Sequence, residues 1–123
     1  MRRFVLGIVC TVLTLTGCNN SLPPETNPSA GREALKTVLD TWVKGGTIED
    51  LKNGNPAIVA HDPDWVAGHK LTKYEIGPND RRSGVDLVLN VTLSLNRKDG
   101  KAQDKKVNYA VAIGSQTVVL RYE

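Results

Sequence analysis

The residues best suited to chemistry lie in one short stretch near the middle of the chain. His61, Asp62, Asp64 and His69 fall within nine residues, and Tyr74 follows them. Imidazoles and carboxylates serve as metal ligands and as general acids or bases. However, the interval H-x7-H matches no established ligand spacing, and Asp62 and Asp64 also suit the start of a short helix. We therefore expect no metal, no cofactor and no catalytic group, and keep His61, Asp64, His69 and Tyr74 as candidate pocket residues.

Longer catalytic motifs are absent from the sequence. It contains no G-x-S-x-G, no G-x-G-x-x-G, no Walker motif and no H-E-x-x-H. These motifs are typical of a serine nucleophile, of dinucleotide binding, of phosphate binding and of zinc binding, respectively. The sequence therefore predicts a protein that is not an enzyme.

The beginning of the chain has the pattern of an export signal. Arg2 and Arg3 precede an apolar run of 12 residues, Phe4 to Leu15, and the run ends at the tetrad Leu15-Thr16-Gly17-Cys18. About 20 apolar residues are needed to cross a bilayer core, so this run is too short to be a membrane span and fits a signal peptide. The tetrad resembles the lipobox of bacterial lipoproteins, in which small residues precede an obligatory cysteine.

The lipobox resemblance implies a lipid anchor. The Cys18 thiol would receive a diacylglyceryl group, residues 1–17 would be removed by a signal peptidase of type II, and the new N-terminus would carry an acyl chain such as palmitate. The partner implied is the membrane itself. Asn19 rather than Asp follows the cysteine, which in two-membrane bacteria implies the periplasmic face of the outer membrane. The alternative is an ordinary signal peptide with a chance cysteine.

Removal of the signal changes the charge balance. The whole chain has 16 Lys and Arg against 13 Asp and Glu, a net charge of +3. Without Arg2 and Arg3 the balance is 14 against 13, a net charge of +1. So small an excess predicts no binding of nucleic acid. Because Cys10 leaves with the signal and Cys18 carries lipid, the folded part has no thiol for a disulfide or a zinc site.

The remainder of the chain divides into a tether and one domain. Residues 18–28 comprise the lipidated cysteine and the segment NNSLPPETNP, whose prolines and asparagines are typical of a linker. Residues 29–123 are 95 residues, enough for a single core. We expect a single α+β domain there.

Helical patterns occupy the first half of this domain. After Ser29 as N-cap, apolar residues recur with helical spacing; they are Leu35, Val38, Leu39, Trp42 and Val43. The pair Gly45-Gly46 ends this helix. Thr47 and Asp50 have the spacing of a capping box for a short second helix, residues 56–60 suit a short strand, and Asp62 followed by Pro63 caps a helical turn.

Alternating apolar residues predict a β-meander in the second half. Val85 to Leu95 has an apolar residue at every odd position, and strands are also expected around Thr72–Ile76, Val107–Ile113 and Val118–Tyr122. A three-residue turn at 98–100 would pair Leu89 with Tyr109, and a two-residue turn at 115–116 would pair Ile113 with Val118. Ile76 would face Val85 across a loop at 77–84.

This register predicts a filled, apolar interface between the helix and the sheet. Six strand residues would face the helix, with no buried charge among them: Leu87, Leu89, Val91, Tyr109, Val111 and Leu120. The fold class is α+β, an N-terminal amphipathic helix packed on an antiparallel β-meander. It resembles a short form of the cystatin-like and nuclear-transport-factor-2-like group. The resemblance lies in the helix end Trp42-Val43-Lys44-Gly45-Gly46 and the following segment Thr47 to Leu51, which look like the opening of those domains.

A second resemblance covers most of the chain. The stretch D-P-D-W-x-A-G-x-x-L-x-x-Y, from Asp62 to Tyr74, is similar to one in small uncharacterised bacterial lipoproteins, and it implies no activity. The function expected is therefore that of a lipid-anchored envelope protein acting as a binding or structural domain, with an envelope protein as a possible partner. The alternative is a small-ligand-binding or hydrolytic domain that uses a pocket between the helix and the sheet.

Overall fold

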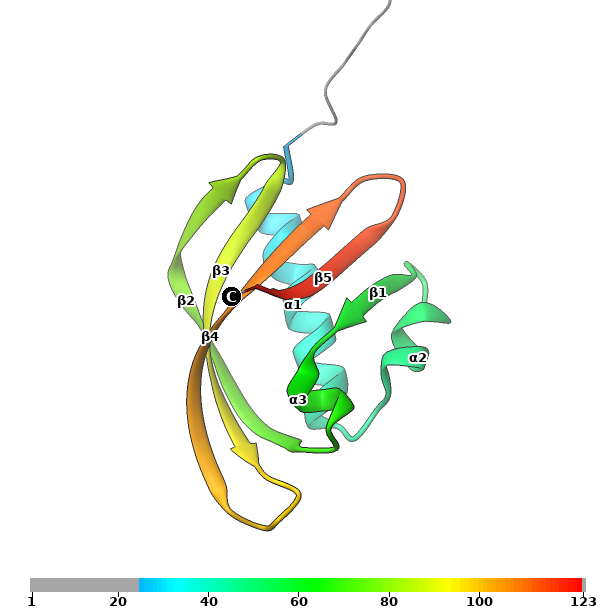
Figure 1. Cartoon of the computed structure of the whole chain (residues 1–123). Coiled ribbons are helices and arrows are strands. Elements are labelled where there is room, and N and C mark those ends of the chain that lie inside the picture. The colour runs from blue at the N-terminus through cyan, green and yellow to red at the C-terminus, as the bar shows by residue number, and fades with distance from the viewer. Residues whose placement is uncertain (1–24, 123) are drawn as a thin grey trace, which may run out of the picture.

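The folded part is built around one five-stranded mixed sheet (Figure 1). The computed structural model describes residues 25–122. The strands are β1 (Ile58–His61), β2 (Lys70–Ser83), β3 (Asp86–Asn96), β4 (Ala102–Ile113) and β5 (Thr117–Tyr122), in the spatial order β1-β5-β4-β3-β2. The helices are α1 (Pro28–Val43), α2 (Ile48–Lys52) and α3 (Pro63–Val66). The α+β class is confirmed.

The prediction of a purely antiparallel sheet is wrong at one edge. β1 pairs with β5 in parallel, with Ile58 opposite Thr117 and His61 opposite Leu120, whereas the other neighbouring strands are antiparallel. A parallel pair needs a long connection between its strands. Here the connection contains α3 and the three strands β2, β3 and β4. Local sequence patterns give no sign of a pairing between such distant segments.

Cap residues set the limits of the helices. The side chain of Asn27 accepts hydrogen bonds from the backbone N–H groups of Ser29 and Ala30, so Asn27 and not Ser29 is the N-cap of α1. Pro28 then occupies the first helical position, where its missing N–H is harmless. The predicted capping box of α2 is confirmed, since Thr47 and Asp50 exchange both hydrogen bonds.

The core lies between α1 and one face of the sheet. Leu35, Val38, Leu39 and Trp42 of α1 are buried, while Val43, expected on the same stripe, is 40% exposed. These helix residues belong to one buried cluster with residues of β3, β4 and β5, namely Leu87, Leu89, Val91, Leu93, Leu95, Tyr109, Val111 and Val119. We call this side the inner face of the sheet.

The register of β3 against β4 is confirmed. Leu89 lies opposite Tyr109, and Val91 lies opposite Val107. Gly100 has a φ of +87°, the left-handed conformation that a three-residue hairpin turn requires. The alternation of β3 determined this register, because a slip by one residue would place polar side chains in the core.

The register of β4 against β5 differs from the prediction by one residue. Ile113 lies opposite Thr117, and Val118 lies opposite Ala112, since the turn has three residues, 114–116, instead of two. The slip exchanges the two faces of β5. Val119 is therefore 1% exposed and Leu120 is 41% exposed. The prediction that Leu120 belongs to the core is wrong.

The predicted loop at 77–84 is mostly strand. β2 continues to Ser83, with an irregularity between Ile76 and Asp80, and turns at Gly84 and Val85. Ile76 consequently pairs with Val91 and not with Val85. The apolar pattern misses this part of β2 because its residues are polar and exposed on both faces.

The folded part begins before residue 29. The backbone N–H of Thr26 donates to the Val85 carbonyl at 3.0 Å, and its Oγ1 accepts from the Ile113 N–H at 3.2 Å. Thr26 is 2% exposed. These contacts join Thr26 to the turn at 84–85 and to the last residue of β4, a region that we call the tether end. Cys18, the signal segment and most of the tether lie outside the described residues.

A pair of leucine substitutions tests the observed register. Leu89→Ala should lower the free energy of unfolding by about 2–5 kcal/mol, because it removes a fully buried side chain from the core. Leu120→Ala is the matched control and should lower it by less than about 1 kcal/mol, as exposed positions do. Equilibrium urea unfolding of the purified chain measures both. A loss at Leu120 as large as that at Leu89 would contradict the register.

Candidate functional site

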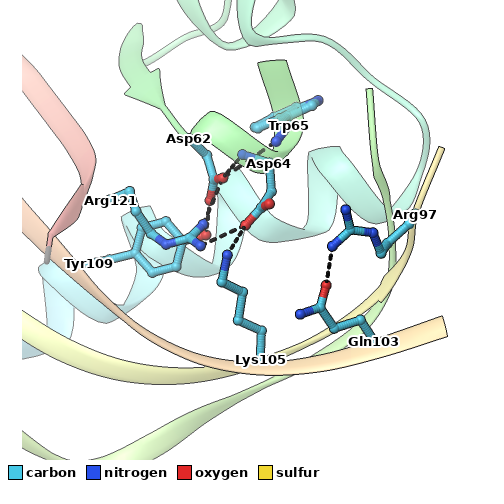
Figure 2. Close-up of polar contacts among 8 residues, drawn as sticks. All are labelled: Asp62, Asp64, Trp65, Arg97, Gln103, Lys105, Tyr109 and Arg121. Carbon is cyan, nitrogen blue, oxygen red and sulfur yellow. Dashed lines mark hydrogen bonds and ion pairs between the residues drawn. The ribbon is translucent and has the colours of Figure 1, made fainter. Parts of the chain in front are cut away.

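Charged side chains meet below the inner face of the sheet, beside α3 (Figure 2). We call this group the Asp62 cluster: Asp62, Asp64, Lys105, Tyr109 and Arg121. The two carboxylates come from the start of α3, while the other three side chains come from β4 and β5. Residues from three elements thus converge on a single ionic network.

Local sequence places the carboxylates. Asp62 is the N-cap of α3, as expected, and its Oδ1 accepts hydrogen bonds from the N–H groups of Asp64 at 2.8 Å and Trp65 at 3.4 Å. Pro63 occupies the first position of the helix. The helical turn holds the side chains of Asp62 and Asp64 toward the same partner on β5.

Arg121 is that partner. Its Nη1 donates to Asp62 Oδ1 at 2.8 Å, and its Nη2 donates to Asp64 Oδ2 at 2.6 Å. The Arg121 and Asp62 side chains are 2% and 3% exposed. Tyr109 donates its hydroxyl to Asp62 Oδ2, and Lys105 Nζ lies 3.2 Å from Asp64 Oδ2. Each carboxylate therefore has a cation and a second donor.

The electrostatics of the cluster favour the charged forms of Asp64 and Arg121. Partial burial opposes the charge on Asp64, but hydrogen bonds and charges from Arg121 and Lys105 prevail and hold its pKa below the usual value. Burial opposes the charge on Arg121 too, yet the two carboxylates raise its pKa. Burial and the Asp62 charge raise the pKa of the Tyr109 hydroxyl, which stays protonated as a donor. Two anions and two cations cancel, so little charge remains to attract a ligand.

The four candidate pocket residues lie in different surroundings. His61 is exposed at the end of β1, and Asp64 belongs to the Asp62 cluster. The Nδ1 atom of His69 accepts from the Lys98 N–H at 2.9 Å, and Tyr74 donates its hydroxyl to Asp40 at 2.5 Å. Within residues 25–122 no group of three His, Cys, Asp or Glu residues has the placement of a metal site.

Sequence reasoning missed Arg121 and Lys105. The predicted register of β5 placed Arg121 on the solvent side, and Lys105 stands among other lysines near a hairpin turn. Only the correct register identifies Arg121 as an inward-facing residue, because it then lies opposite Tyr109. The expectation of an inner face without buried charge is therefore wrong.

An open groove lies at the edge of the core, between α1 and the segment from α2 to β1. Its volume is about 680 Å³, and its lining includes Ala34, Thr37, Thr41, Leu51, Ile58 and Ile113. The two threonine hydroxyls donate to carbonyls of α1, at 2.9 and 2.8 Å. Glu33, Asp50 and Asn55 also line the groove, but most of its surface is apolar, as in small-molecule sites.

Comparisons with known proteins give no further assignment. No protein-family model, no curated protein and no solved structure matches the chain. Within the described residues, no helix is both long enough and apolar enough to cross a membrane.

The Asp62 cluster predicts that two aspartates at helix starts differ greatly in how much they stabilise the fold. Asp62→Asn should destabilise the fold by about 3 kcal/mol, the lower end of the range for a broken buried pair, because Asp64 still neutralises part of the Arg121 charge. A cap alone would tolerate asparagine. Asp50→Asn is the matched control, since Asp50 caps α2 at an exposed site, and it should be nearly neutral. Urea unfolding of both variants measures the difference, and equal small effects would contradict a structural role for the ion pair.

Proposed function

We propose that this chain is a lipid-anchored protein of the bacterial cell envelope, whose folded part acts as a binding or structural domain and not as an enzyme. The tetrad Leu15-Thr16-Gly17-Cys18 after a basic and apolar segment carries the anchoring part of this proposal. The membrane is the partner through the lipid on Cys18, with residues 1–17 removed. In a two-membrane envelope the proposed location is the periplasmic face of the outer membrane.

The organisation of the domain supports a binding or structural role. Three of the four candidate pocket residues have partners within the protein, since Asp64 pairs with Arg121, His69 accepts from Lys98 and Tyr74 donates to Asp40. The interface between α1 and the centre of the sheet is filled with buried apolar residues. Such an arrangement favours surface recognition over chemistry in a central cavity.

The finer fold assignment is also part of the proposal. A cystatin-like or nuclear-transport-factor-2-like domain packs an N-terminal helix against a curved antiparallel sheet. The position of α1 behind β5 and the antiparallel order of β2 to β5 support this assignment (Figure 1). The parallel edge strand β1 is an addition to the expected pattern.

The tether geometry is consistent with anchoring. Seven residues lie between Cys18 and Thr26, and such a segment reaches roughly 20–25 Å when it is extended. Thr26 enters the fold at the tether end, whereas the β3–β4 turn at 97–101 lies at the opposite end of the strands (Figure 1). The proposed lipid would therefore hold one end of the domain close to the bilayer.

Substitution of the two cysteines tests the anchor. In the producing bacterium, Cys18→Ala should abolish processing and lipidation, because the acceptor thiol is lost. Cys10→Ala is the matched control and should leave the mature product unchanged. Intact-mass measurement should find Cys18 at the mature N-terminus with two or three acyl chains, the number that gives stable attachment. An unmodified mature N-terminus at another residue would contradict the proposal.

The apolar groove beside α1 favours a second candidate function. A small-ligand-binding or hydrolytic domain would use this groove, which lies between α1 and the β1–β5 edge. Its lining differs from the expected His61, Asp64, His69 and Tyr74, since none of these four residues contributes to it.

A blocking variant distinguishes this second candidate. Thr37→Phe places a ring in the groove and should weaken the binding of an apolar fluorescent probe at least tenfold. Lys36→Phe is the matched control on the same helix, at an exposed position outside the groove, and should leave binding unchanged. Fluorescence titration of the purified chain measures both variants. Absence of probe binding to the unsubstituted chain would count against this function.

A further inference from the structure

The face of the sheet that points away from α1, which we call the outer face, carries an ordered set of polar side chains. On β3, Asn90 and Thr92 alternate with the buried residues Leu89, Val91 and Leu93. Because side chains alternate along a strand, Asn90 and Thr92 point away from the core. Figure 1 shows α1 passing behind β5, with no described helix in front of that strand.

One row of this face crosses four strands. Asn90 of β3 lies opposite Asn108 of β4, and Asn108 lies opposite Tyr122 of β5. Gly77 of β2 adjoins Asn90 on the other side, where an added Cβ would lie only 3.3 Å from the Asn90 carbonyl oxygen. The row thus places two amides side by side, between a position without a side chain and an aromatic ring that is 41% exposed.

The neighbouring row is polar and balanced in charge. Glu75 of β2 lies opposite Thr92, and Thr92 lies opposite Lys106 of β4. Together the two rows form a pocket of about 410 Å³, lined by Glu75, Gly77, Asn90, Val91, Thr92, Lys106, Val107 and Asn108. This volume lies within the range of sites for small molecules.

The hydrogen-bonding groups of this pocket are free. Within the described part of the chain, the side chains of Asn90, Asn108, Thr92, Glu75 and Lys106 form no hydrogen bond or ion pair. Each asparagine offers an NH₂ donor and a carbonyl acceptor. The pocket can therefore give and accept several hydrogen bonds without breaking any within the protein.

These properties restrict the class of ligand. One carboxylate and one ammonium cancel, which disfavours a polyanion or a polycation. The polar groups also disfavour a purely apolar partner, because their burial without hydrogen bonds would be costly. Paired donors and acceptors beside an exposed ring suit a neutral sugar chain, whose hydroxyls hydrogen bond while its C–H faces pack on the aromatic ring.

We propose that the outer face binds a neutral glycan carrying acetamido groups, with Asn90 and Asn108 as the central contacts and Tyr122 as a packing surface. An acetamido group has one N–H and one carbonyl, which match the carbonyl and the NH₂ of an asparagine side chain. This inference deepens the proposed envelope function, since it names the chemistry of a partner for the binding domain. It does not depend on which membrane holds the lipid.

Calorimetric titration of the full chain in mild detergent tests the inference. The probe is a β-1,4-linked N-acetylglucosamine tetrasaccharide, and the corresponding glucose tetrasaccharide, which lacks acetamido groups, should bind at least tenfold more weakly. The double variant Asn90→Ala/Asn108→Ala should weaken binding of the first sugar at least tenfold. Tyr122→Ala should also weaken it, whereas Tyr122→Phe retains the ring and should have little effect.

A matched control separates the site from general surface effects. Asn53→Ala removes an exposed amide next to α2, away from the pocket, and should leave sugar binding unchanged. Urea unfolding midpoints close to that of the unsubstituted chain show that the variants fold. Absence of binding, equal binding of the two sugars, or unchanged binding by the folded double variant would overturn the inference. None of these results affects the mass measurement on Cys18, so the two proposals fail separately.

Discussion

The ion pair between Asp62 and Arg121 is the interaction on which the arrangement of the chain depends. β1 and β2 lie at opposite edges of the sheet, yet only residues 62–69 connect them. Four strand spacings amount to about 19 Å, and this segment also contains the helical turn α3. A connection so short has to cross the inner face of a curved sheet. Asp62 holds it there through Arg121 of β5 and Tyr109 of β4, the first two strands that the connection crosses after β1.

Two tryptophans support the same crossing from the other side. Trp65 of α3 stacks on Trp42 of α1, with ring centroids 5.3 Å apart. The indole N–H of Trp42 donates to the His69 carbonyl at 3.0 Å. α3 therefore lies between two anchoring contacts. Ion pairs hold its start to β5, and the stacked tryptophans hold it to α1. This closes one end of the core, and the described residues include no cysteine that could form a disulfide.

The parts of the fold that the sequence predicts are those with a strong local signal. The alternation in β3 determines its register with β4, and the capping residues Thr47 and Asp62 mark the starts of α2 and α3. The rest depends on contacts between distant segments. β1 pairs with the last strand, and the polar half of β2 pairs with β3 after an irregularity. Neither pairing leaves an apolar pattern that a single sequence can reveal.

The candidate site was less predictable than the fold for a related reason. The positions of Asp62 and Asp64 as helix-starting residues were evident, but their partner Arg121 is 57 residues or more away in the sequence. The polar rows on the outer face likewise become visible only when the register of four strands is known. Asn90 and Asn108 are unremarkable in the sequence, and the sheet makes them neighbours.

The Asp62 cluster also explains how β5 finds its register. β5 has apolar residues on both faces, Val119 on one and Val118 and Leu120 on the other, so apolar burial alone does not distinguish the two registers. A slip by one residue would bring Leu120 into the core and would turn Arg121 toward solvent. Asp62 would then remain buried without a cation, which is far more costly than the exchange of one apolar residue for another. A buried ion pair adds little net stability on average, but here it separates two registers that the hydrophobic effect leaves nearly equal. The charge that the apolar pattern did not predict is thus what selects the face of β5 that enters the core.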